Sequence, residues 1–117
     1  MNKLHVIIVL LLLASFTLAD TIYVPDDYST IQAGIDAAGS GDTVSVAAGT
    51  YVENIMLKGG VIVDGAGADV CMINGSGSGS VVTYNSGDTA QIKNFTITNG
   101  NASTGGGIYV DNQSRPR

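Results

Sequence analysis

The feature that most constrains the fold of this chain is a series of short β-prone segments that end again and again in Asp-Gly or Asn-Gly. Residues 61–63, 70–73 and 92–98 are each followed by Asp-Gly or Asn-Gly, while residues 81–84 and 108–110 are followed by the related turn sequences Asn-Ser-Gly and Asp-Asn. Asp-Gly and Asn-Gly are typical of two-residue hairpins, but strands this short form poor ladders in a sandwich. They suit a coil in which each strand pairs in parallel with its equivalent one turn below, so that like side chains stack inside. The sequence therefore predicts an all-β parallel β-helix.

The composition favours the same fold. Charged residues make up 13 % of the 117 residues and aromatic residues 6 %, while Gly occurs 16 times. A helical bundle would use more Lys and Glu, and a disordered chain would contain less Val and Ile.

Val44, Val61 and Phe95 are taken as equivalent positions of successive coils, and their spacing is uneven.

One helix is predicted, over residues 29–38. Ser29 and Gln32 form a capping box, in which the Ser29 hydroxyl accepts from the Gln32 N–H and the Gln32 side chain reaches back. Ile31 and Ile35 lie on one face of that helix, and glycines follow it.

Residues 1–19 have the layout of a secretory signal peptide. Lys3 precedes an unbroken apolar run over residues 6–13, and small residues stand three before and one before a cut after Ala19. The uncharged stretch ends at Ala19 and is shorter than the about 20 residues that a membrane span needs. The chain is therefore predicted to be secreted or displayed at the cell surface, with no membrane span after cleavage.

The mature chain is predicted to be acidic. It contains ten acidic and four basic residues, so its formal charge is −6. A charge of this sign does not indicate binding to nucleic acid. Its only cysteine, Cys71, lies in an apolar segment and is expected to be buried and inert. The one histidine, His5, is lost with the leader, which excludes histidine-based catalysis.

Two longer stretches carry a resemblance to a known family. Residues 29–38 and 41–55, with their Ser-Thr-Ile-Gln and Gly-Asp-Thr-Val motifs, resemble the N-terminal signature of pectin-lyase-like right-handed parallel β-helix proteins. Residues 94–100 and 105–110 resemble later repeats of large secreted members, and more distantly those of polymorphic outer-membrane autotransporters. The resemblance covers nearly all of residues 21–112. It implies a right-handed β-helix whose open top is capped by the helix.

The C-terminal end departs from that family. Residues 113–117 are polar and unlike a strand, whereas the family continues for more coils and closes with its own cap. Residues 20–112 are therefore predicted to be the cap and first coils of a truncated β-helix, and residues 113–117 a truncation end. A last coil with unpaired backbone groups is expected to aggregate or to associate end to end.

Three aspartates are the candidates for a metal site. Lyases of this fold typically hold Ca²⁺ with acidic residues, and Asp64, Asp69 and Asp88 are the corresponding candidates. The simpler interpretation is that each Asp caps a turn, and that Asn at the bends adopts positive φ. No other cofactor and no catalytic set is evident, since no Arg is positioned with these aspartates.

Two classes of function follow. The first is a non-catalytic surface protein that binds polysaccharide or forms an adhesive rod. The second is a polysaccharide lyase or glycoside hydrolase whose catalytic coils lie beyond this chain. The first is favoured, because the mature chain lacks a plausible catalytic set.

The leader generates the first testable prediction. The exported product should begin at Asp20 or within a residue or two of it, because Ala19 completes the cleavage pattern. Intact-mass measurement and N-terminal sequencing of the exported protein check this. A membrane-bound product that retains Met1 would contradict it.

Overall fold

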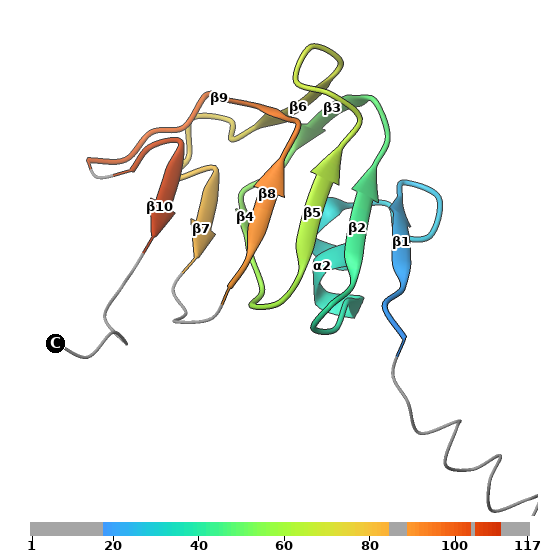
Figure 1. Cartoon of the computed structure of the whole chain (residues 1–117). Coiled ribbons are helices and arrows are strands. Elements are labelled where there is room, and N and C mark those ends of the chain that lie inside the picture. The colour runs from blue at the N-terminus through green and yellow to red at the C-terminus, as the bar shows by residue number, and fades with distance from the viewer. Residues whose placement is uncertain (1–17, 85–88, 104, 111–117) are drawn as a thin grey trace, which may run out of the picture.

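The computed structural model describes residues 18–84, 89–103 and 105–110 as a parallel β-helix of three coils with one short helix at its N-terminal end (Figure 1). The chain rises through the front strands, descends behind them and advances from right to left, so the β-helix is right-handed, as predicted. Residues 1–17 of the predicted leader and the tail 113–117 lie outside the described residues.

Three sheets form the sides of the β-helix, and every pairing between their strands is parallel. Sheet A contains β1 (Thr21–Val24), β2 (Thr43–Val46), β5 (Ile62–Gly65) and β8 (Gln91–Lys93). Sheet B contains β3 (Gly49–Val52), β6 (Cys71–Asn74) and β9 (Thr96–Thr98). Sheet C contains β4 (Ile55–Met56), β7 (Val82–Tyr84) and β10 (Ile108–Val110).

The register of sheet A corrects the sequence-based alignment of the coils. Val44 pairs with Val63, and Val63 pairs with Ile92, whereas the alignment had used Val61 and Phe95. Val61 is buried but comes just before β5, and Phe95 follows β8 at the bend into β9. The bends between strands differ in length, so a fixed offset cannot find the paired residues.

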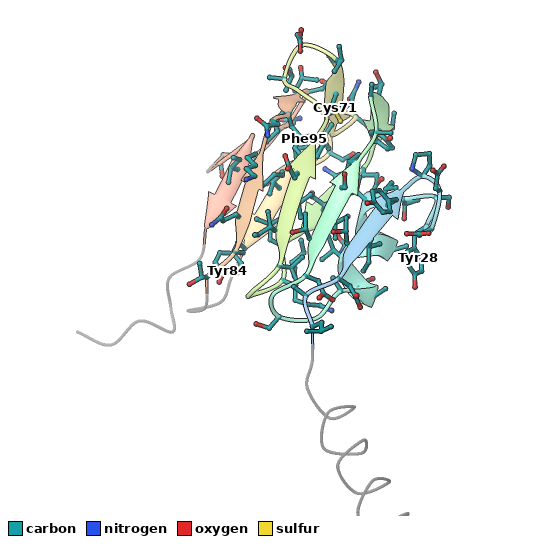
Figure 2. All side chains as sticks on the ribbon, turned by 45° about the vertical axis from the view of Figure 1, so that its right-hand side comes forward. Tyr28, Cys71, Tyr84 and Phe95 are labelled. Carbon is teal, nitrogen blue, oxygen red and sulfur yellow. The ribbon has the colours of Figure 1, made fainter. Side chains whose placement is uncertain are left out.

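The core is an apolar column inside the three sheets. Strand residues alternate between inside and outside, so every second residue is buried against its equivalent in the next coil. The inward residues of the described strands are mostly Val and Ile, and Val44, Val63 and Ile73 are completely buried. Cys71 is buried among them, as predicted (Figure 2).

The helix α2 (Ile31–Ala37) covers the N-terminal end of this column. Ile31 and Ile35 are buried, which confirms the predicted apolar face. The predicted capping box is wrong: Thr30 is the N-cap, and its hydroxyl accepts from the Ala33 N–H at 3.1 Å. Gln32 does not reach back, because its side chain pairs instead with both backbone groups of Met56 in β4.

Two charged side chains of the first coil hold the ends of α2. The Glu53 carboxylate accepts from the backbone N–H groups of Ile31 at 2.8 Å and Gln32 at 3.1 Å. Lys58 Nζ donates to the carbonyls of Asp36 at 2.9 Å and Ala38 at 2.8 Å. A carboxylate at the N-terminus and an ammonium at the C-terminus both interact favourably with the helix dipole. The first coil therefore fixes its own cap.

Gly34 lets the helix lie directly against sheet A. A Cβ at this position would come within 3.0 Å of Val24 Cγ2 and 3.1 Å of Val44 Cγ1. These are valine methyls of the buried column, which is close-packed and has little room to move. The absence of a side chain at residue 34 thus sets the distance between the helix and the sheet.

The cap generates the second prediction. Ile35→Asp places an unpaired charge on the buried face of α2. This should lower the free energy of unfolding by several kcal/mol, out of the about 5–15 kcal/mol that is typical of a domain. Urea denaturation followed by circular dichroism measures the loss. Ala37→Asp is the matched control, because Ala37 is exposed on the same helix and should cost about 1 kcal/mol or less. Equal stability of both variants would show that α2 is not a cap.

Candidate functional site

The outer face of sheet A carries a row of four different polar groups. Alternation along each strand turns Tyr23, Ser45, Asp64 and Lys93 outward, and the strand register places them side by side across β1, β2, β5 and β8. We call these four residues the sheet A row. Neighbouring strands are about 4.8 Å apart, so the row presents a phenol, a hydroxyl, a carboxylate and an ammonium at regular steps.

The two ends of the row are the more exposed. The Tyr23 side chain is 52 % exposed, and Lys93 is also exposed, while Ser45 and Asp64 are half-buried. The Tyr23 backbone is fixed by Asp27, whose carboxylate accepts from the Tyr23 N–H at 2.8 Å. Asp64 is fixed from the next coil, where Asn94 Nδ2 donates to its Oδ1 at 2.7 Å.

Sequence reasoning had found only Asp64 among these four residues. Asp64 was visible because it precedes a glycine, but the partners of the row depend on the register, which the sequence did not supply. A signal does exist, since Tyr23, Ser45 and Asp64 each stand between two apolar or small residues in a strand-length segment. Lys93, beside Ile92, fits the same alternation.

The aspartates proposed as Ca²⁺ ligands have separate environments. Asp64 points outward from β5 and is held by Asn94, and Asp69 is exposed in the bend between β5 and β6. Asp88 lies outside the described residues. Within the described ranges, no group of three or more His, Cys, Asp or Glu side chains could hold a metal ion.

Asp42, which is not one of these three candidates, has a carboxylate that caps a turn. Its carboxylate accepts from the backbone N–H groups of Asp20 at 2.9 Å and Gly39 at 2.8 Å. These two hydrogen bonds lower the pKa of Asp42 below its ordinary value. Asp64 differs, because the partner recorded for its side chain is Asn94 of the next coil.

Asparagines occupy bends between successive strands of a coil, as predicted. Asn94 and Asn99 both have positive φ, at 67° and 62°, which Asn tolerates better than most residues. Asn99 Nδ2 donates to Asn74 Oδ1 at 3.1 Å, so one bend is tied to the equivalent bend of the preceding coil. Stacked asparagines therefore hold the corner between sheets B and C.

Two other features of the structure are the Cys71 thiol and a hollow beside sheet A. Burial raises the pKa of the Cys71 thiol, which disfavours the reactive thiolate. A shallow hollow of about 260 Å³ lies at the corner before sheet A and is lined by glycines, by apolar residues such as Val61 and Ile62, and by polar residues such as Ser40 and Thr89. None of the described residues that line it is charged.

Comparison with known proteins does not assign the chain to a family, because no family model and no curated protein matches the sequence. The part of the chain that the structure describes contains no helix that is long and apolar enough to span a membrane. The sheet A row is thus the feature on which a functional proposal can rest.

The environments of the aspartates generate the third prediction. Millimolar Ca²⁺ should leave the thermal unfolding midpoint unchanged relative to EDTA, because a useful Ca²⁺ site needs several converging oxygen ligands. Differential scanning calorimetry of the wild type and of Asp64→Asn measures this. A Ca²⁺-dependent rise in the midpoint that Asp64→Asn abolishes would place a Ca²⁺ site at Asp64.

Proposed function

We propose that this chain is the N-terminal segment of an exported, non-catalytic parallel β-helix protein that binds polysaccharide through the sheet A row. The observation that carries the proposal is the register of Tyr23, Ser45, Asp64 and Lys93 on one rigid outer face. Export rests on the signal-like leader, residues 1–19, and places the protein at the cell surface or in the medium.

The chemistry of the row suits a sugar chain. A tyrosine ring offers an apolar face with a polar edge, on which the C–H face of a sugar ring can stack. The Ser45 hydroxyl both donates and accepts, the Asp64 carboxylate accepts, and the Lys93 ammonium donates, so sugar hydroxyls find both kinds of partner. Because backbone pairing fixes all four strands, little backbone entropy is lost on binding.

The charge of the molecule favours a neutral glycan. The mature chain carries a formal charge of −6, and Asp64 lies within the row itself. A polyanionic glycan would be repelled by this charge at low ionic strength, although salt screens much of the effect. Lys93 alone is too little positive charge to reverse that balance.

A polysaccharide lyase or glycoside hydrolase with catalytic coils beyond this chain is the alternative. Glycoside hydrolysis needs two carboxylates about 5 to 9.5 Å apart across the sugar bond. Among the outward-facing residues of the described sheet A strands, Asp64 is the one carboxylate. A single carboxylate held by an amide supports binding better than bond cleavage.

The proposal is tested by removing the stacking ring. Tyr23→Ala should weaken binding to a neutral polysaccharide about 2- to 12-fold, the effect expected from losing one aromatic stacking contact. Isothermal titration calorimetry against a panel of soluble neutral glycans measures it. Tyr28→Ala is the matched control, because Tyr28 is an exposed tyrosine in the turn after β1 and outside the row (Figure 2).

Three outcomes would count against the proposal. If the protein bound none of the neutral glycans, the proposal would be wrong. It would also be wrong if Tyr23→Ala and Tyr28→Ala lowered the glycan affinity equally. The third is turnover: unsaturated uronate formed from pectate with or without Ca²⁺, or new reducing ends from a neutral glycan. Turnover lost in Asp64→Ala would establish the enzymatic alternative instead.

A further inference from the structure

The hollow at the corner before sheet A is formed by the bends of successive coils. These bends precede β2, β5 and β8, and they lie side by side at the base of these strands in Figure 1. Backbone hydrogen bonds join them: the Gly41 N–H donates to the Gly60 carbonyl at 2.7 Å, and the Gly60 N–H donates to the Thr89 carbonyl. The hollow is therefore a fixed part of the stacked coils.

Glycines leave this hollow free of side chains at two of its bends. Gly60 has a φ of 82°, and a Cβ there would come within 2.9 Å of the Ser40 Cα atom. No side chain fits at residue 60 unless the neighbouring backbone moves. A Cβ at Gly41, by contrast, would meet nothing within 4 Å, so the space beside that residue is open.

The hollow lies beside the sheet A row. A second line of outward residues stands two positions before the row in each strand and consists of Thr21, Thr43, Ile62 and Gln91. Ile62 and Gln91 also line the hollow. Two strand residues span about 6.6 Å, so one line of side chains separates the row from the hollow.

The size and the lining of the hollow suit a short neutral sugar branch. Its volume of about 260 Å³ is just below the about 300–1,000 Å³ of pockets for drug-sized ligands, and a hollow of about 350 Å³ adjoins it at Ser40, Gly60 and Thr89. The Ser40 and Thr89 hydroxyls and the Gln91 amide can both donate and accept hydrogen bonds, while Ile62 offers an apolar contact. Because none of the described lining residues is charged, a charged sugar would find no counter-ion there.

We propose that the hollow binds a short neutral side branch of a glycan whose main chain lies along the sheet A row. The row runs across the strands, and the hollow lies along the strand direction from it. A branch that leaves the main chain near Asp64 would therefore pass over Ile62 into the hollow, which we call the branch subsite. The ligand class is then a branched neutral polysaccharide. The branch subsite rests on the proposed function, because the row must hold the main chain.

Pairs of neutral oligosaccharides that share a main chain, one branched and one linear, test the branch subsite. Galactose-branched and linear mannan, xylose-branched and linear β-glucan, and arabinose-branched and linear xylan oligosaccharides supply such pairs. The wild type should bind the branched member of at least one pair about 2- to 12-fold more tightly, which is the effect of one additional hydrogen bond. Isothermal titration calorimetry measures both affinities, and their ratio is the readout.

Substitutions in the hollow should bring this ratio towards one. Thr89→Leu removes a hydroxyl and puts a larger apolar side chain into the hollow. Gln91→Ala removes an exposed amide and leaves the backbone pairing of β8 intact. Thr50→Leu is the matched control, because Thr50 is exposed in β3 of sheet B and should keep the wild-type ratio. Circular dichroism confirms that each variant is folded.

The outcomes distinguish the branch subsite from the row. Tyr23→Ala should weaken the binding of both members of a pair by the same factor, because its ring contacts the main chain. Equal or weaker binding of the branched member in every pair would overturn the branch subsite and leave the row intact. The same conclusion would follow if Thr89→Leu and Gln91→Ala both kept the wild-type ratio. A protein that bound none of these oligosaccharides would overturn the branch subsite and the proposed function together.

Discussion

The structure depends on the parallel pairing of each strand with the strand one coil away. Among the described strands, none pairs with its neighbour in the sequence, apart from β1 with β2 across the helix. Each coil therefore has no stable existence without the next, and the Val and Ile side chains become buried only when coils stack. The same constraint creates two ends, and at each end a layer of core and a set of strand edges must be covered.

At the N-terminal end, α2 covers the core, and side chains of the first coil hold the helix in place. Glu53 and Lys58 follow β3 and β4 in the first coil, so the coil that needs covering also supplies the partners of the helix ends. Gln32 completes the attachment by pairing with Met56 as a neighbouring strand would.

The outer surface is free to vary because the inner column carries the fold. Bends of different length leave the register of sheet A intact, since only the inward residues must match from coil to coil. The outward residues can then differ completely, as Tyr23, Ser45, Asp64 and Lys93 do. A rigid column with an unconstrained outer face is a natural support for recognition of an extended ligand.

The sequence by itself determined the local elements. Short β-prone segments, the apolar spacing of Ile31 and Ile35, and asparagines at the bends were enough to predict a parallel β-helix with one short helix and with Cys71 inside. Tertiary structure alone decided the register, the true N-cap Thr30 and the partners of Glu53 and Lys58. These depend on which residues meet across a coil of variable length. Local propensity and spacing carry no information on that length, so the sheet A row could not be assembled from the sequence.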